Sequence, residues 1–158
     1  TMPSATFNTT QENVIQLYLA NMSPPPDLVV VNAGLHLLLS QTEEQIRATF
    51  RSRLLWEMGA LQRAVPNAKL VWVGTTYDML RYNSTRATVE FMNAVARKAA
   101  RQLDFAYVDA QSLSRLMVSL YADGIHLIFQ HGSYYNLVRD LIASWYCGGG
   151  STLARDDA

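Results

Sequence analysis

Cysteine is almost absent from this sequence, which has one, Cys147, among 158 residues. A single thiol excludes a disulfide within the chain and a cysteine-based zinc site. Cys147 is then either a small buried apolar side chain near the end of a helix or one half of a bridge to a cysteine outside this chain.

Charge is scarce and balanced. Lys and Arg number 13, Asp and Glu number 13, and charged residues make up 16% of the chain, against about 25% in a typical soluble domain. A neutral chain has no electrostatic attraction for nucleic acid, so we expect no nucleic-acid partner. Hydrophobic residues make up 49%, which predicts one globular domain over residues 1–147, whole or part of a larger one. Gly148-Gly149-Gly150 ends the last expected helix, and we expect residues 148–158 to form a flexible tail.

Long hydrophobic runs are also missing. The longest, Leu28–Leu39, contains Asn32 and His36 and is too short to span a bilayer, so we expect no membrane span. No signal peptide is present. The chain starts at Thr1-Met2, which we interpret as a processed end or as the edge of a fragment.

Three glycosylation sequons begin at Asn8, Asn21 and Asn83, where about one is expected by chance. Pro24 follows the second sequon, which should weaken Asn21 as an acceptor. The enrichment favours a secreted protein or one in the lumen of the secretory pathway.

Motifs for metals and nucleotides are missing as well. His131 lies five residues after His126, which is not the helical spacing of a metal-binding pair. Neither a P-loop nor the glycine-rich dinucleotide motif occurs. We therefore expect no metal and no cofactor.

What the chain does have is a regular alternation of helical and extended patterns. Leu28–Val31 and Leu70–Val73 are apolar on both faces, as parallel strands buried between helix layers are. The helix between them can start with a capping box at Ser40 or at Thr42. The other expected elements are helices at about 10–21, 84–103, 112–120 and 132–146, and a third strand, Phe105–Asp109. This order predicts a three-layer α/β/α fold with a flavodoxin-like parallel sheet.

Chemistry in such sheets gathers beyond the carboxyl ends of the strands. Those ends are Asn32–His36, Gly74–Asp78 and Asp109–His131. The last of them contains Asp123 three residues before His126. A carboxylate at this spacing can turn back to hold an imidazole ring and stabilise its protonated form, although the pattern also fits an ordinary turn before a helix.

Two longer stretches resemble blocks of a known family. Asp27–Leu37 resembles the third conserved block of the SGNH/GDSL hydrolases, and its turn, Asn-Ala-Gly-Leu-His, is similar to that of the PC-esterase branch. Tyr107–Leu127, a strand followed by Asp-Gly-Ile-His-Leu, resembles the family's last block. The helix containing Met92–Ala96 also resembles the family's helix before that strand, so the likeness extends over most of Asp27–Tyr146.

The resemblance implies an ester hydrolase or O-acyltransferase acting on an acyl ester, above all an acetyl ester of a carbohydrate. His126 would be its general base and Asp123 the carboxylate that orients it. The backbone N–H of Gly34 and the side chain of His36 would flank the oxyanion hole, although His36 stands where the family has Asn and can equally be packed structurally.

Asn32 and Thr75 lie at the strand ends that would form the pocket. For Thr75 and its neighbour Thr76, hydroxyl-to-backbone hydrogen bonding is the favoured alternative.

The family's nucleophile, a serine in a Gly-Asp-Ser motif after the first strand, does not occur in this sequence. Ser133 lies on the wrong side of the base in chain order. One interpretation is that the first strands and the serine belong to an upstream segment or a partner chain, which also covers the sheet edge at Leu28–Val31. Another is a catalytically inactive module with a structural or interaction role. A small-ligand-binding protein of flavodoxin-like fold is a third.

Overall fold

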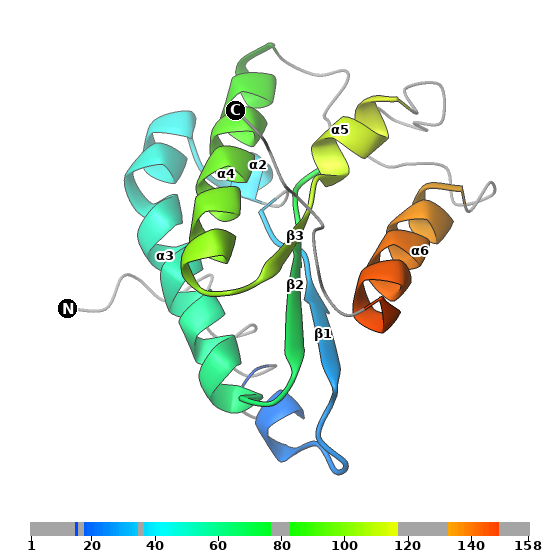
Figure 1. Ribbon diagram of the computed structural model, residues 1–158. Coiled ribbons are helices and arrows are strands. Elements are labelled where there is room, and N and C mark those ends of the chain that lie inside the picture. Colours follow the sequence, from blue (N-terminus) through cyan, green and yellow to red (C-terminus); the bar gives the residue numbers. More distant parts are fainter. Residues whose placement is uncertain (1–14, 16–17, 35–36, 77–82, 117–132, 149–158) are drawn as a thin grey trace.

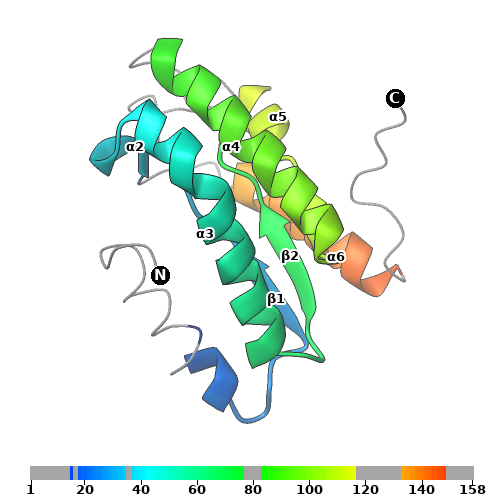
Figure 2. The same ribbon diagram turned by 90° about the vertical axis from the view of Figure 1, so that its left-hand side faces the viewer.

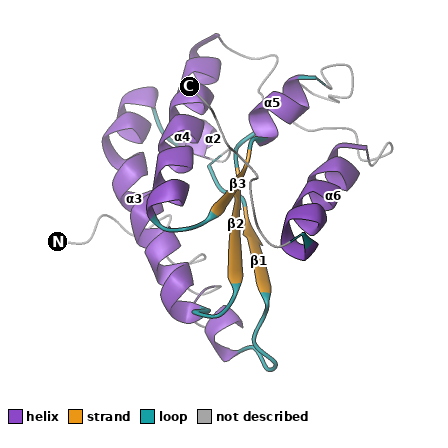
Figure 3. Cartoon of the chain, viewed as in Figure 1, coloured by secondary structure: helices purple, strands orange, loops and turns teal. Residues whose placement is uncertain are grey.

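The computed structural model describes residues 15, 18–34, 37–76, 83–116 and 133–148. Helices and strands alternate along this part of the chain (Figure 1, Figure 3). In chain order the elements are η2 (Leu19–Asn21), β1 (Leu28–Val31), α2 (Leu37–Ser40), α3 (Glu43–Ala64), β2 (Lys69–Val73), α4 (Asn83–Gln102), β3 (Ala106–Val108), α5 (Ala110–Arg115) and α6 (Ser133–Cys147).

The three strands form one parallel sheet in the order β1-β2-β3. Val29 of β1 lies opposite Leu70, and Trp72 lies opposite Tyr107 of β3. Helices α3 and α4 cover one face of the sheet, and α6 lies on the opposite side (Figure 1, Figure 2). This is the predicted three-layer α/β/α arrangement, since each parallel connection carries a helix across a face of the sheet.

Each face of the sheet has its own hydrophobic core, because successive strand residues point to opposite sides. On the side of α3 and α4, Trp72 and Tyr107 pack with apolar residues of the two helices, among them Phe50, Leu54, Met58, Met92 and Ala96. On the side of α6, the core consists of Val71, Val73, Val108, Ala110 and Ile142.

The start of α3 decides between the two capping boxes that the sequence allows. The backbone N–H of Thr42 donates to Oε1 of Gln45 over 2.8 Å, and the N–H of Gln45 donates to Oγ1 of Thr42 over 3.3 Å. Thr42 is therefore the N-cap, and Ser40 ends the short helix α2. The reciprocal bonds satisfy two backbone donors that the first turn leaves without partners.

The expectation that β1 is buried on both faces is wrong for one face. Val29 is buried on the side of α3, but Val30, which faces the other way, is 46% exposed. The core that α6 makes with the sheet is centred on β2 and β3, and only Leu28 of β1 packs against it.

The alternative that Cys147 is a buried side chain is also wrong, because its side chain is exposed at the end of α6. Other differences from the sequence-based expectations concern boundaries. The third strand is shorter than predicted, and α5 begins at Ala110 rather than near Ser112, because Asp109 caps it by accepting the N–H of Ser112 over 3.0 Å. The expected helix at 10–21 lies mostly outside the described residues, as does the tail from residue 149. Within the described ranges, no helix combines the length and the apolar character needed to cross a membrane.

Candidate functional site

The carboxyl ends of the three strands meet at one edge of the sheet. Asn32 follows β1, Gly74 follows β2 and Asp109 follows β3. The Asn32 amide joins the first two ends: its Nδ2 donates to the carbonyl oxygen of Val73 over 2.8 Å and to that of Gly74 over 3.1 Å. The turn after β1 is thereby fixed to the turn after β2.

Gly34 occupies a position that admits no side chain. It is buried, its φ is +127°, and a Cβ there would lie 2.5 Å from Cε of Met92 and 3.1 Å from Oγ1 of Thr75. Both the backbone angle and the lack of space require glycine. The carbonyl oxygen of Gly34 accepts the N–H of Leu37 over 2.9 Å, which turns the chain into α2.

Thr75 is 3% exposed, and its polar groups are bonded to the protein. Its N–H donates to Oδ1 of Asn93, and its carbonyl accepts from Nδ2 of the same amide, each over 2.8 Å. Its hydroxyl is 3.4 Å from the carbonyl oxygen of Ala33. The hydroxyl-to-backbone bond that the sequence favoured for Thr75 is therefore present, while its role as a pocket residue stays a prediction.

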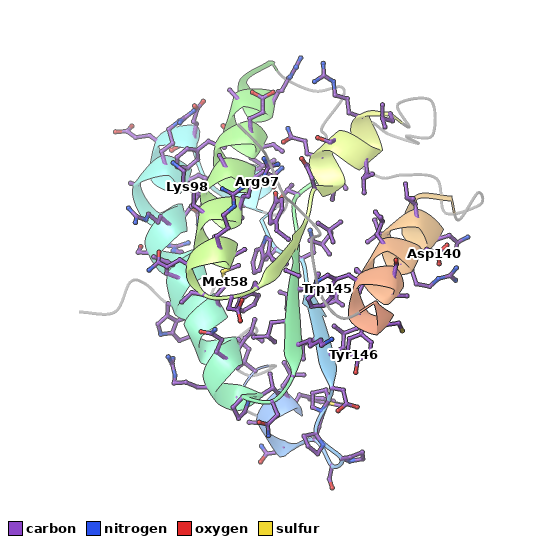
Figure 4. The ribbon with its side chains drawn as sticks, in the orientation of Figure 1. Met58, Arg97, Lys98, Asp140, Trp145 and Tyr146 are labelled. Carbon is purple, nitrogen blue, oxygen red and sulfur yellow. The ribbon has the colours of Figure 1, made fainter. Side chains whose placement is uncertain are left out.

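A polar cluster extends the site from β2 to β3 and α5. Nδ2 of Asn93 also donates to Oε1 of Gln111 over 3.0 Å. Arg97 of α4 forms an ion pair with Asp109 at 2.7 Å (Arg97 is labelled in Figure 4), and its guanidinium lies over the Tyr107 ring, 5.3 Å from the centroid. The cluster links α4 to the ends of β2 and β3.

The Tyr107 hydroxyl lies between α4 and the second turn. It is 3.5 Å from the carbonyl oxygen of Asn93, and a Cβ on Gly74 would come within 2.5 Å of it. Burial, and after it the negative charge of Asp109, raise the pKa of Tyr107 to about 12 against the opposing effect of Arg97. Tyr107 therefore stays protonated, and it serves here to shape the Gly74 turn.

The other predicted site residues are distributed as follows. His126, Asp123 and His36 lie outside the described residues, and so does the sequon residue Asn8. Of the remaining sequon residues, Asn21 is exposed at the end of η2, and Asn83 is the first residue of α4. The structure brings together Asn32, Gly34 and Thr75.

Several solved structures of other proteins are similar to this chain. No protein-family profile matches the sequence, and no curated protein matches it. A mutant of an acetyl-xylooligosaccharide esterase from Geobacillus matches with a TM-score of 0.64 and 14% identity, over 95% of this chain and 71% of its own. A second structure of the same enzyme, described as the acetylxylan esterase Axe2 from Geobacillus stearothermophilus, matches over the same shares with a TM-score of 0.58 and 16% identity. The chain has an SGNH-like α/β fold.

A third solved structure, phospholipase A1 from Streptomyces albidoflavus, is similar over 71% of this chain and 60% of its own, with a TM-score of 0.50 and 15% identity. At identities of 14–16% the three matches establish the SGNH-like fold alone. The fold that brings the carboxyl ends of the three strands together here is therefore also found in a solved esterase.

Asn93 is one of the site residues to which sequence reasoning assigned no role; Arg97, Tyr107 and Gln111 are others. Asn93 is buried on α4, and its side chain makes three hydrogen bonds at the edge of the sheet where the carboxyl ends of the strands meet. The signal was available, because an amide beside Met92 on the apolar face of a helix needs buried partners. Which backbone groups supply them depends on how α4 packs against the end of β2, and that is a tertiary feature.

Proposed function

We propose that this chain is part of an SGNH-type ester hydrolase of the PC-esterase-like branch. The observation that carries the proposal is the structural match to acetylxylan esterases over 95% of the chain. The Asn32–Gly34 turn supports it, because it lies at the edge of the sheet where ligands bind in folds of this kind. The non-catalytic alternative gains no support, since the reported neighbours are esterases and a phospholipase.

In the proposed reaction, a serine hydroxyl attacks the carbonyl carbon of the ester while His126 takes the hydroxyl proton. Asp123 holds the imidazole and stabilises its protonated form. The bond to the alcohol then breaks, and His126 gives the proton to the departing oxygen. Water attacks the acyl-serine in the same way and releases the acid; a sugar hydroxyl in place of water makes the reaction an acyl transfer.

Two groups are proposed to stabilise the negative charge on the carbonyl oxygen. They are the backbone N–H of Gly34 and the side chain of His36. The place of Gly34 supports this role, because its φ of +127° lets the chain turn directly after β1, at the edge of the sheet where ligands bind in folds of this kind. Asn32 and Thr75 hold the turn in place through their bonds to β2 and to Ala33.

The proposed substrate is an acetyl ester of a carbohydrate, which is the class that the Geobacillus esterase Axe2 is named for in both of its structures. No Gly-Asp-Ser motif occurs in the 158 residues, so we propose that the nucleophilic serine comes from outside them. We place the activity outside the cell or in a secretory lumen, on the strength of the three sequons.

The test compares two histidines in the natural protein at its natural length. We expect His126→Ala to lower the hydrolysis of acetylated xylooligosaccharide and of p-nitrophenyl acetate by about 10³-fold, since the reaction loses its general base. His131→Ala is the matched control and should retain turnover, with unchanged circular dichroism in both variants. Full turnover in the His126 variant would refute the assigned base, and an unmodified protein inactive on both esters would refute the hydrolase.

A further inference from the structure

The Asn93 side chain fixes the orientation of a second amide, that of Gln111 in α5. Asn93 is itself oriented by the backbone of Thr75, whose N–H donates to Oδ1 and whose carbonyl accepts from Nδ2, each over 2.8 Å. The second N–H of Nδ2 then needs an acceptor, and Oε1 of Gln111 supplies it over 3.0 Å. The Nε2 group of Gln111 is therefore the end of its amide that is turned away from Asn93.

This Nε2 group has two N–H donors to offer to a ligand. Within the described part of the chain, the bond to Asn93 is the one hydrogen bond of the Gln111 side chain, so neither N–H of Nε2 is used. Gln111 is half-buried, and its Nε2 remains accessible to solvent. The amide thus has one end bonded inside the protein and the other end available at the surface.

The helix turn that carries Gln111 is held on both sides. Ala110 and Ser114, which flank Gln111 on the inner face of α5, are each 0% exposed. Asp109 caps the same helix and is paired with Arg97 of α4 over 2.7 Å. A polar group that is fixed before a ligand arrives loses little conformational entropy on binding it.

Gln111 lies at the same edge of the sheet as the Asn32–Gly34 turn, since α5 directly follows the end of β3 (Figure 1). Nδ2 of Asn93 bonds to both the Thr75 carbonyl and Gln111, so the Gln111 amide lies beside the end of β2. The Thr75 hydroxyl lies 3.4 Å from the carbonyl oxygen of Ala33, at the end of β1. Ligands of open parallel sheets bind beyond this edge.

We propose that Gln111 is a substrate-binding residue, whose Nε2 donates a hydrogen bond to an oxygen of the carbohydrate that carries the ester. The class of ligand rests on the proposed function. A neutral amide with two N–H donors suits a neutral sugar, which offers several acceptor oxygens side by side. The ester carbonyl oxygen is the other candidate acceptor, but that oxygen is already assigned to Gly34 and His36.

Gln111→Glu tests the donor while keeping the acceptor, because a carboxylate has an oxygen for Nδ2 of Asn93 but donates no hydrogen bond. In the natural protein at its natural length, we expect this variant to raise KM for acetylated xylooligosaccharide about 10-fold with little change in kcat. Turnover of p-nitrophenyl acetate, which has no sugar, should not change. Gln102→Glu adds the same charge at an exposed position of α4 and should leave both esters unaffected.

A second variant separates the lost donor from the added charge. Gln111→Ala removes the amide without adding a charge, and we expect the same rise in KM for the oligosaccharide. An effect that is present in Gln111→Glu and absent in Gln111→Ala would come from the charge, and it would overturn the role as a donor.

Binding of xylotetraose, measured by calorimetry, gives a readout that needs no turnover. We expect both Gln111 variants to raise its Kd about 10-fold, and Gln102→Glu to leave it unchanged. The thermal unfolding of Gln111→Glu should match that of the unmodified protein, because Asn93 keeps its acceptor.

Three further results would overturn the role of Gln111. One is an unchanged KM and Kd for the oligosaccharides in both variants. Another is an equal loss on both esters, which would mean that the amide acts through Asn93 on the turn and not on the sugar. The third is an unmodified protein that hydrolyses p-nitrophenyl acetate without binding xylotetraose.

The ester-hydrolase proposal survives each of these results, since it fails only if the unmodified protein hydrolyses neither ester. In that case the Kd for xylotetraose still decides whether Gln111 binds a sugar.

Discussion

At the scale of single residues, Glu57 is the least expected feature of the fold. Glu57 lies on α3 among the buried residues, and the residue as a whole is 6% exposed. Desolvation raises the pKa of Glu57 to about 7, and the positive charge of Arg53, one turn earlier, opposes that shift. A carboxyl in this environment is neutral below pH 7 and becomes a buried charge above it.

The linkage between pKa and stability gives a prediction for Glu57. The pKa of Glu57 is about 7 in the folded protein, against an ordinary value of 4.5 for a glutamate, so the folded protein binds the proton more tightly than the unfolded chain does. The stabilisation from the neutral carboxyl is complete below pH 4.5 and is lost as the pH rises to about 7. We therefore expect Glu57→Gln to be more stable than the unmodified protein at pH 8, by up to about 3 kcal/mol.

Urea unfolding at pH 5 and pH 8 measures this difference. The gain from Glu57→Gln should be small at pH 5 and should grow with pH. Glu44→Gln, at an exposed position of the same helix, is the control and should show no change in its effect between the two pH values. An advantage for the Glu57 variant that is equal at both would contradict the raised pKa.

At the scale of elements, α4 is attached to the end of β2 by the Asn93 side chain. The Asn93 side chain accepts a hydrogen bond from the N–H of Thr75 and donates one to the Thr75 carbonyl, as a neighbouring strand would. It also donates a hydrogen bond to the side chain of Gln111, which lies in α5. One side chain thus holds a helix, a strand end and a second helix together. Because all these groups are buried or partly buried, their hydrogen bonds have no ready substitute in water.

We expect Asn93→Leu to lower the free energy of unfolding by about 2–4 kcal/mol, because it leaves the N–H and the C=O of Thr75 without partners. Thermal or urea unfolding measures the loss. Lys98→Leu, on the exposed face of the same helix (Figure 4), is the matched control and should change stability by less than about 0.5 kcal/mol. A loss for Asn93→Leu no larger than this control would show that the amide is not needed.

The elements themselves could be predicted from the sequence because their signals are local. The apolar run of β2 and the Thr42 capping box both depend on near neighbours in the chain. The exposure of Val30 could not be predicted in this way, since it depends on where α6 crosses the sheet. Glu57 differs, because it lies three residues after Leu54 and four before Leu61, so the helical pattern itself directs this carboxyl toward the core.

At the scale of the whole molecule, the three-layer fold could be predicted from the alternation of strands and helices, because parallel strands leave few other arrangements. The candidate site was predicted in part. Gly34 and Thr75 follow strands whose carboxyl ends must meet, whereas the bonds that hold them depend on the packing of α4. His126 and Asp123 lie outside the described residues, and their roles rest on the family resemblance.

The last prediction concerns the whole molecule and the compartment in which it folds. If the protein passes through the secretory pathway, we expect glycans at Asn8 and Asn83, so that removing N-glycans lowers the mass of the natural protein in discrete steps. Asn21 is exposed but should stay unmodified, because Pro24 follows its sequon. Asn8→Gln and Asn83→Gln should each remove one step, and Asn21→Gln, the control, should remove none. If glycosidase treatment leaves the mass of the natural protein unchanged, the proposed location is contradicted. That result would not bear on the fold or on the esterase chemistry.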